Sequence, residues 1–180
     1  MRVLAFTGMP FSGKSEAVKI AKEMNIPVIR MGDMIWEEVK KRKLELSDKN
    51  VGTIANQMRE EHGKDIWARR TLEKIKSIEN NNFIVIDGIR NVEEIDLFKR
   101  YFQGDFVVVT VESSDDIRQK RALTRYREDD SRDLQKIKER DNRELNWGLG
   151  KVIESANIVV LNEGSVEDFH KKIRDILERF

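Results

Sequence analysis

The chain has 180 residues, of which 39% are hydrophobic and 37% charged, a composition that suits one globular unit with a substantial core. The 34 basic residues nearly cancel the 33 acidic ones, which argues against a protein that binds nucleic acid or membrane surfaces along its whole length. The absence of cysteine excludes disulfides and thiolate metal sites and gives no support to secretion. No apolar run of the sequence is long enough to cross a bilayer, so we expect a cytoplasmic protein with no membrane partner.

In the N-terminal part, short apolar runs alternate with amphipathic segments, which is typical of alternating strands and helices. The predicted elements are, in order, a strand at 3–7, a helix at 15–24, a strand at 27–31, and helices at 33–43, 50–61 and 64–79. Asp33 is a plausible N-cap of the helix that it begins.

The alternation continues through the rest of the chain. The predicted elements are a strand at 83–86, a helix at 91–101, a strand at 106–111, very polar helices at 114–127 and 131–146, a strand at 158–161 and a helix at 165–179. Asn91 and Ser165 each precede an acidic residue at capping-box spacing. Apolar strands that alternate with helices predict a parallel sheet covered on both faces. We therefore expect a three-layer α/β fold with five parallel strands, in a single domain over residues 1–180, and ligands at the carboxyl ends of the strands.

A glycine-rich turn follows the first predicted strand and matches the phosphate-binding motif G-x-x-x-x-G-K-[ST] at every fixed position. It consists of Gly8, Met9, Pro10, Phe11, Ser12, Gly13, Lys14 and Ser15. Backbone N–H groups of such a P-loop surround phosphate, and the following helix adds the positive end of its dipole. Gly13 keeps side chains out of the loop, Lys14 can reach the β- and γ-phosphates, and Ser15 can offer its hydroxyl to Mg²⁺. The sequence thus predicts binding of ATP with Mg²⁺.

The apolar strand at 83–86 is followed directly by Asp87, which is the Walker B pattern of an apolar strand with an acidic residue at its end. Asp87 would hold Mg²⁺ directly or through water. An Asp-Gly pair such as Asp87-Gly88 is also a common turn, and it is the P-loop that favours the metal-binding interpretation.

These motifs resemble those of small P-loop nucleotide kinases. The chain is similar over essentially its whole length to adenylate kinase and dephospho-CoA kinase, and most closely to an archaeal group of adenylate-kinase-related P-loop proteins. The resemblance implies a P-loop kinase-like fold with a helical acceptor-binding segment at 33–80 and a short, arginine-rich helical lid at 114–146.

The resemblance also implies an acceptor site. Gly32 and Asp33 match the segment that opens the monophosphate-binding helices of adenylate kinases, but Trp36 stands where those enzymes carry an acceptor-binding arginine. Asp33 also matches the general base of dephospho-CoA kinases, which a hydroxyl acceptor needs and a phosphate acceptor does not; the alternative is a simple N-cap. Arg90 matches the arginine of the adenylate kinase segment Asp-Gly-Phe-Pro-Arg and would face the acceptor phosphate.

In the lid, Arg121 and Arg125 lie one helical turn apart, with a spacing similar to the start of an adenylate kinase lid. Arg127 opens a segment similar to the one that closes such lids. The resemblance implies catalytic roles for Arg121 and Arg125 and nucleotide contact for Arg127, because arginines stabilise a transferring phosphoryl group. Asn162 begins a turn similar to one that lies near the adenine in dephospho-CoA kinases; the alternative is a plain strand-to-helix turn with a capping serine. For many of these arginines the alternative is a solvated, salt-bridged helix pair.

Together, these features predict a kinase that transfers the γ-phosphoryl group of ATP to a nucleoside monophosphate or to a dephospho-CoA-like hydroxyl. The alternative is an ATPase that switches an RNA, ribosomal or protein partner and has no small-molecule acceptor. A third possibility is a non-catalytic nucleotide sensor. The presence of Lys14, Ser15 and Asp87, which phosphoryl transfer uses, argues against it. The acceptor and the oligomeric state stay open at this point.

Overall fold

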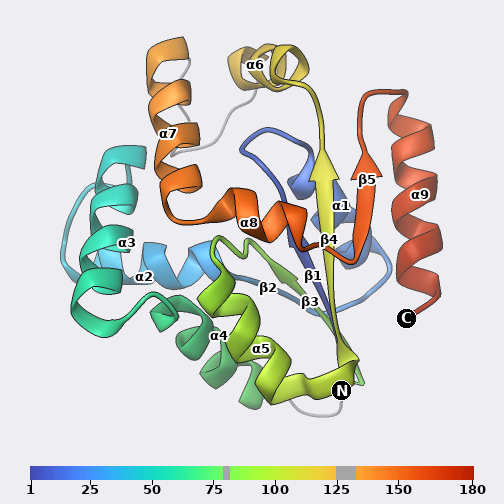
Figure 1. Cartoon of the computed structure of the whole chain (residues 1–180), viewed down its shortest axis with the longest axis horizontal. Coiled ribbons are helices and arrows are strands. Elements are labelled where there is room, and N and C mark those ends of the chain that lie inside the picture. Colours follow the sequence, from blue (N-terminus) through green and yellow to red (C-terminus); the bar gives the residue numbers. More distant parts are fainter. Residues whose placement is uncertain (79–81, 125–132) are drawn as a thin grey trace.

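The computed structural model describes residues 1–78, 82–124 and 133–180. Within these ranges, five parallel strands form one sheet in the order β2-β3-β1-β4-β5 (Figure 1). The strands are β1 (Arg2–Thr7), β2 (Val28–Arg30), β3 (Phe83–Asp87), β4 (Phe106–Glu112) and β5 (Ile158–Leu161). The expected α/β fold with a five-stranded parallel sheet is confirmed.

Helices connect the strands and cover both faces of the sheet. In the described ranges they are α1 (Lys14–Glu23), α2 (Met31–Lys41), α3 (Asp48–His62), α4 (Ile66–Lys76), α5 (Val92–Phe102), α6 (Asp115–Thr124), α7 (Leu134–Asn146), α8 (Leu149–Glu154) and α9 (Val166–Glu178), with a 3₁₀ turn η1 (Gln103–Asp105) after α5. The short helix α8 was not predicted, because six residues are too few to show a helical period. No helix in these ranges has the length and apolar character that crossing a bilayer requires.

Two cores lie on opposite faces of the sheet, and β1 contributes to both. Val3 and Ala5 pack with residues of α2, α3, α4, α5 and α8, whereas Leu4 and Phe6 pack with α1 and α9. All four side chains are fully buried. Because alternate side chains of a strand point to opposite faces, a central strand between two helical layers must be apolar throughout, which explains the unbroken run from Val3 to Phe6.

Two of the three predicted N-caps are confirmed. Oδ1 of Asn91 accepts a hydrogen bond from the backbone N–H of Glu94 at 2.9 Å, and Oγ of Ser165 accepts one from Asp168 at 3.1 Å. The predicted N-cap at Asp33 is wrong. Strand β2 runs directly into α2, so Arg30 is the N-cap, and Asp33 lies inside the first turn, where the helix dipole favours a carboxylate.

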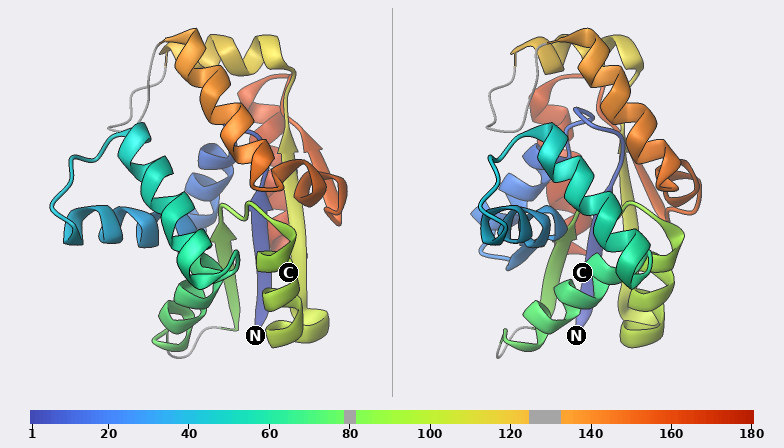
Figure 2. Two further views of the ribbon diagram at one scale, coloured as in Figure 1. Left: turned by 60° about the vertical axis from the view of Figure 1, so that its left-hand side comes forward. Right: turned by 90° about the vertical axis from the view of Figure 1, so that its left-hand side faces the viewer.

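The strand order places the predicted motifs at one end of the sheet. Strand β3 lies between β2 and β1, and its last residue, Asp87, aligns with Phe6 of β1 and Arg30 of β2. The P-loop, Asp87 and the start of α2 therefore meet at the carboxyl ends of neighbouring strands. Helices α6 and α7 lie beyond the same end, with α3 close to α7 (Figure 2).

Candidate functional site

The P-loop owes its shape to two glycines. Gly8 and Gly13 have φ angles of 134° and 112°, in the left-handed region that side chains disfavour. A Cβ on Gly8 would lie 2.3 Å from the carbonyl oxygen of Val111, and a Cβ on Gly13 would lie 2.0 Å from Nδ2 of Asn162. Both the backbone conformation and the closeness of β4 and the turn after β5 therefore require glycine at these positions.

Lys14 begins α1 and is buried at the end of this loop. Its Nζ donates hydrogen bonds to the carbonyl oxygens of Gly8 and Met9. Burial, and then the nearby cation Arg90, lower the pKa of Lys14 from 10.5 to about 7, against the opposing effect of Glu144 and Asp87. A buried ammonium group with a lowered pKa gains stability from an added anion, which is what a nucleotide phosphate would supply.

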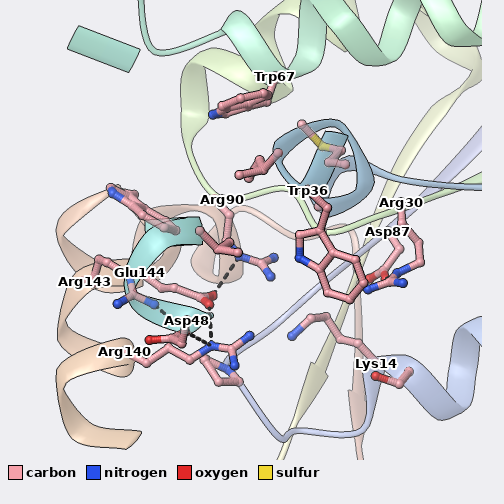
Figure 3. A pocket seen from close by; sticks show the side chains of 18 of the residues that line it. Lys14, Arg30, Trp36, Asp48, Trp67, Asp87, Arg90, Arg140, Arg143 and Glu144 are labelled. Carbon is pink, nitrogen blue, oxygen red and sulfur yellow. Dashed lines mark hydrogen bonds and ion pairs between the residues drawn. The ribbon is translucent and has the colours of Figure 1, made fainter. Parts of the chain in front are cut away.

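A cavity of about 110 Å³ opens beside the P-loop (Figure 3). Its walls include Trp36 of α2, Trp67 of α4 and Trp147 at the end of α7, which are all three tryptophans of the chain. Small-molecule sites usually measure roughly 300 to 1,000 Å³. In this conformation the cavity is therefore smaller than a typical small-molecule site.

Charged side chains crowd this cavity. Of the described residues, six cationic and four acidic ones line it: Lys14, Arg30, Arg59, Arg90, Arg140, Arg143, Asp48, Asp87, Glu94 and Glu144. The excess of positive charge in a partly dehydrated site favours anionic ligands.

Glu144 of α7 lies between Arg90 and Arg140 (Figure 3). It is 3% exposed, and its carboxylate lies 2.7 Å from Nε of Arg90 and 3.3 Å from Nε of Arg140. Burial opposes its ionisation, but Arg90, Arg140 and Lys14 together hold the pKa of Glu144 below its usual value. A carboxylate from α7 thus lies beside two cations, Lys14 and Arg90, that the sequence assigns to phosphates.

A second group of ion pairs joins α3 to α7 at one side of the cavity. Nη2 of Arg143 lies 2.8 Å from Oδ1 of Asp48, and Nε of Arg140 lies 3.6 Å from the same oxygen. These pairs connect the N-terminal end of α3 to α7.

Arg30 links the two predicted acidic site residues. Its Nη1 lies 3.2 Å from Oδ1 of Asp33, its Nε lies 3.6 Å from Oδ2 of Asp87, and its Cζ lies 5.3 Å from the ring centre of Trp36. The Asp33 side chain is 44% exposed, whereas that of Asp87 is 13% exposed. Asp87 lines the cavity and Asp33 does not.

The residues present fit a magnesium ion. Ser15 and Asp87 line the same cavity and offer a hydroxyl and a carboxylate oxygen. Mg²⁺ prefers oxygen ligands of this kind and is commonly bound through one or two side chains together with substrate phosphates.

Arg121 and Asn162 brace the P-loop instead of lining the cavity. Nη1 of Arg121 donates to the carbonyl oxygen of Ser12 at 3.0 Å, and Nη2 donates to that of Asn162 at 2.8 Å. Nδ2 of Asn162 also donates to the carbonyl oxygen of Ser12, at 2.9 Å. In this structure the guanidinium of Arg121, predicted to be catalytic, contacts the back of the loop.

The structure brings most of the predicted site together. The predicted residues that line the cavity are Pro10, Phe11, Gly13, Lys14, Ser15, Gly32, Asp87 and Arg90. Gly8, Met9 and Ser12 build the loop behind it, while Arg125 and Arg127 lie outside the described residues. The sequence did not reveal Arg59 and Glu144, because on polar helices such residues look like ordinary solvated charges.

Comparison with known sequences shows a family. A profile described as an AAA domain matches residues 7–138. A UPF0200/UPF0201 protein from Archaeoglobus fulgidus is 44% identical over 178 residues, 98% of this chain, which spans only 55% of that relative. UPF0200 proteins from Methanosarcina mazei and Methanosarcina acetivorans are 39% and 40% identical over 180 residues, covering 100% of this chain and 96% of each relative.

Solved structures share the fold. The protein TT1252 from Thermus thermophilus superposes with a TM-score of 0.65 at 16% identity, covering 99% of this chain and 97% of the other. Shikimate kinase from Aquifex aeolicus gives a TM-score of 0.54 at 20% identity, covering 98% and 96%. These likenesses support a P-loop kinase-like fold. The expected similarity to adenylate kinase and dephospho-CoA kinase is not confirmed by them.

Proposed function

The chain belongs to the UPF0200 family, and from that premise we propose that it is an ATP-dependent phosphotransferase. The observation that carries the proposal is that the P-loop, Asp87 and Arg90 open onto one cationic cavity. Donor phosphates and an anionic acceptor could thus be held within one site, as phosphoryl transfer requires.

The donor side consists of the P-loop and its neighbours. Backbone N–H groups of the loop and the N-terminal end of α1 would bind the β- and γ-phosphates of ATP. Lys14 would exchange its bonds to Gly8 and Met9 for phosphate oxygens, and Ser15 and Asp87 would hold Mg²⁺. The metal, when bound, neutralises charge on the phosphate oxygens.

The acceptor side consists of α2 and the turn after β3. Gly32 and Arg90 line the cavity, and Arg90 would bind an anionic group of the acceptor. Asp33 is paired with Arg30 and does not line the cavity, so it would have to turn toward the acceptor to orient or deprotonate a hydroxyl. We propose a nucleoside monophosphate or a dephospho-CoA-like hydroxyl compound as the acceptor.

The test is a phosphoryl-transfer assay. The protein is mixed with Mg²⁺, ATP labelled on the γ-phosphate, and a panel of nucleoside monophosphates, nucleosides and dephospho-CoA, and products are identified by mass spectrometry. We expect label on at least one acceptor. ATP that binds tightly while label reaches none of them would contradict the kinase assignment.

The alternative, an ATPase that switches an RNA, ribosomal or protein partner, is favoured by Trp36, which lines the cavity at the position where the resemblance to adenylate kinases implies an acceptor-binding arginine. The same assay separates the two functions. Label released as inorganic phosphate, at a rate that RNA or cell extract increases, would support the ATPase.

A further inference from the structure

Arg59 of α3 is buried without enough hydrogen-bond acceptors. The residue is 8% exposed, and its Nε and Nη1 have no hydrogen-bond partner among the described residues. Its Nη2 reaches Oε1 of Glu94 at 3.4 Å. Buried donors without acceptors are rare because each raises the free energy of the folded state, and a guanidinium group cannot lose its proton to avoid this.

The carboxylate of Glu94 contacts both the guanidinium group of Arg59 and the backbone of Arg90. Glu94 is fully buried; its Oε1 faces Arg59, and its Oε2 accepts a hydrogen bond from the backbone N–H of Arg90 at 2.7 Å. Both arginines line the same cavity. Glu144 adds a second negative charge, but its contact is with the side chain of Arg90. The two unpartnered donors of Arg59 therefore lie in the same cavity wall as the side chain of Arg90.

Flat apolar surfaces surround this cationic wall. The Cζ atom of Arg59 lies 4.2 Å from the ring centre of Trp147, and Trp36 and Trp67 line the same cavity. Stacking on Trp147 fixes the guanidinium plane, so the donors are oriented before a ligand arrives. Aromatic walls beside oriented donors suit a ligand with a flat or apolar body and an anionic group.

We propose that Arg59 and Arg90 form an anion subsite for the acceptor, and that the acceptor is a small molecule with a flat or apolar body and an oxyanion. The oxyanion, a phosphate monoester or a carboxylate, accepts hydrogen bonds from the unpartnered N–H groups of Arg59 and replaces Glu144 beside Arg90. The identification of this ligand as the acceptor rests on the proposed kinase function.

The experiment measures anion binding with the nucleotide site already filled. The full chain is saturated with Mg²⁺ and a non-hydrolysable ATP analogue, and is then titrated separately with inorganic phosphate, AMP and benzoate. Tryptophan fluorescence and calorimetry follow the binding. Inorganic phosphate and AMP represent the phosphate source, and benzoate represents the carboxylate source.

Two matched variants are compared with the unmodified chain. Arg59→Lys retains a positive charge opposite Glu94 but removes the guanidinium donors, so the fold is preserved; thermal unfolding checks this. Arg70→Lys is the control. Arg70 also pairs with a buried glutamate, Glu38, at 2.9 Å and lies 5.2 Å from the ring centre of a tryptophan, Trp67, but it is not among the residues that line the cavity.

We expect at least one of the three probes to bind the unmodified chain, and Arg59→Lys to weaken that binding by about tenfold or more. Arg70→Lys should leave it within about twofold, and both variants should bind the ATP analogue normally. Arg59-dependent binding of phosphate and AMP identifies a phosphate group, and Arg59-dependent binding of benzoate identifies a carboxylate.

The proposal is overturned if none of the probes binds, if Arg59→Lys binds them as well as the unmodified chain, or if Arg70→Lys weakens binding equally. Equal binding by Arg59→Lys would mean that water satisfies the buried donors. Failure of the ATP analogue to bind the unmodified chain would instead contradict the proposed function, so the two failures are distinguishable.

Discussion

The halves of the cavity that we propose for the phosphate donor and for the acceptor are built from different parts of the polypeptide. The donor half is one continuous loop whose backbone would bind phosphate, and Arg121 and Asn162 hold it in place through the carbonyl oxygen of Ser12. The proposed acceptor half is made of side chains from α2, α3, the turn after β3, α5 and α7, and its cations Arg59, Arg90 and Arg143 are paired with Glu94, Glu144 and Asp48. A backbone site binds what all nucleotides share, whereas a side-chain site can change its ligand by substitution. We therefore expect substitutions in the donor half to affect ATP binding and turnover, and substitutions in the acceptor half to affect binding of the second ligand.

The largest effect should come from the donor half. Lys14→Met removes the cation that would contact the β- and γ-phosphates, so kcat/KM for ATP should fall by about 10²- to 10³-fold. The matched control is Lys19→Met on the same helix, where the side chain is 63% exposed and activity should be retained. ATP turnover by Lys14→Met near the unmodified rate would contradict the assignment of the P-loop.

Arg121→Met tests whether ATP binding depends on the hydrogen bonds that Arg121 donates at the back of the P-loop. The variant loses hydrogen bonds to the carbonyl oxygens of Ser12 and Asn162, so the free energy of unfolding should fall by about 2 to 3 kcal/mol, and ATP should bind about tenfold more weakly. Lys120→Met, at an exposed neighbouring position, is the control. A variant with normal stability and normal ATP affinity but a much lower kcat would instead support the catalytic role that the sequence predicts for Arg121.

Glu144→Gln tests the acceptor half through a substitution that should strengthen binding of an anion. Without the carboxylate, Arg90 and Arg140 lose a buried counter-charge, so the free energy of unfolding should fall by about 3 kcal/mol. The same loss frees Arg90, so inorganic phosphate should bind the nucleotide-saturated protein several-fold more tightly. Glu139→Gln, at an exposed position on the same helix, should change neither quantity. Weaker phosphate binding by Glu144→Gln would show that Glu144 does not compete with the ligand.

The smallest effect concerns protons at Lys14. Because burial and Arg90 lower its pKa from 10.5 to about 7, most free protein carries a neutral Lys14 at about pH 8. Bound triphosphate favours the charged amine, so ATP binding should take up nearly one proton at about pH 8 and almost none at about pH 6. Calorimetry in buffers of different ionisation enthalpy measures this uptake, and Lys14→Met should abolish it. Equal uptake by the variant would assign the proton to another group.

The same contrast explains what could be predicted from the sequence. The P-loop is a local motif, and Asp87 reaches it because β3 pairs with β1, an arrangement that alternating strands and helices favour. The cap at Asn91 is local too. The predicted N-cap at Asp33 was wrong because β2 runs directly into α2, so that the last strand residue, Arg30, is the N-cap.

The acceptor half depends on tertiary packing. Arg59 and Glu144 lie on helices far apart in the chain, and neither belongs to a motif. The sequence singled out Arg121 but not the group that its guanidinium contacts. A helical period does not say whether an arginine side chain faces a ligand or a carbonyl oxygen of a loop.

The most direct test of the account is a crystal structure with Mg²⁺ and a non-hydrolysable ATP analogue. We predict that the β- and γ-phosphates lie against the P-loop N–H groups and Nζ of Lys14, with Mg²⁺ between the phosphates and Ser15 and with Asp87 facing the metal. A nucleotide bound elsewhere, or Lys14 still bonded to the carbonyl oxygens of Gly8 and Met9 beside a bound nucleotide, would contradict it.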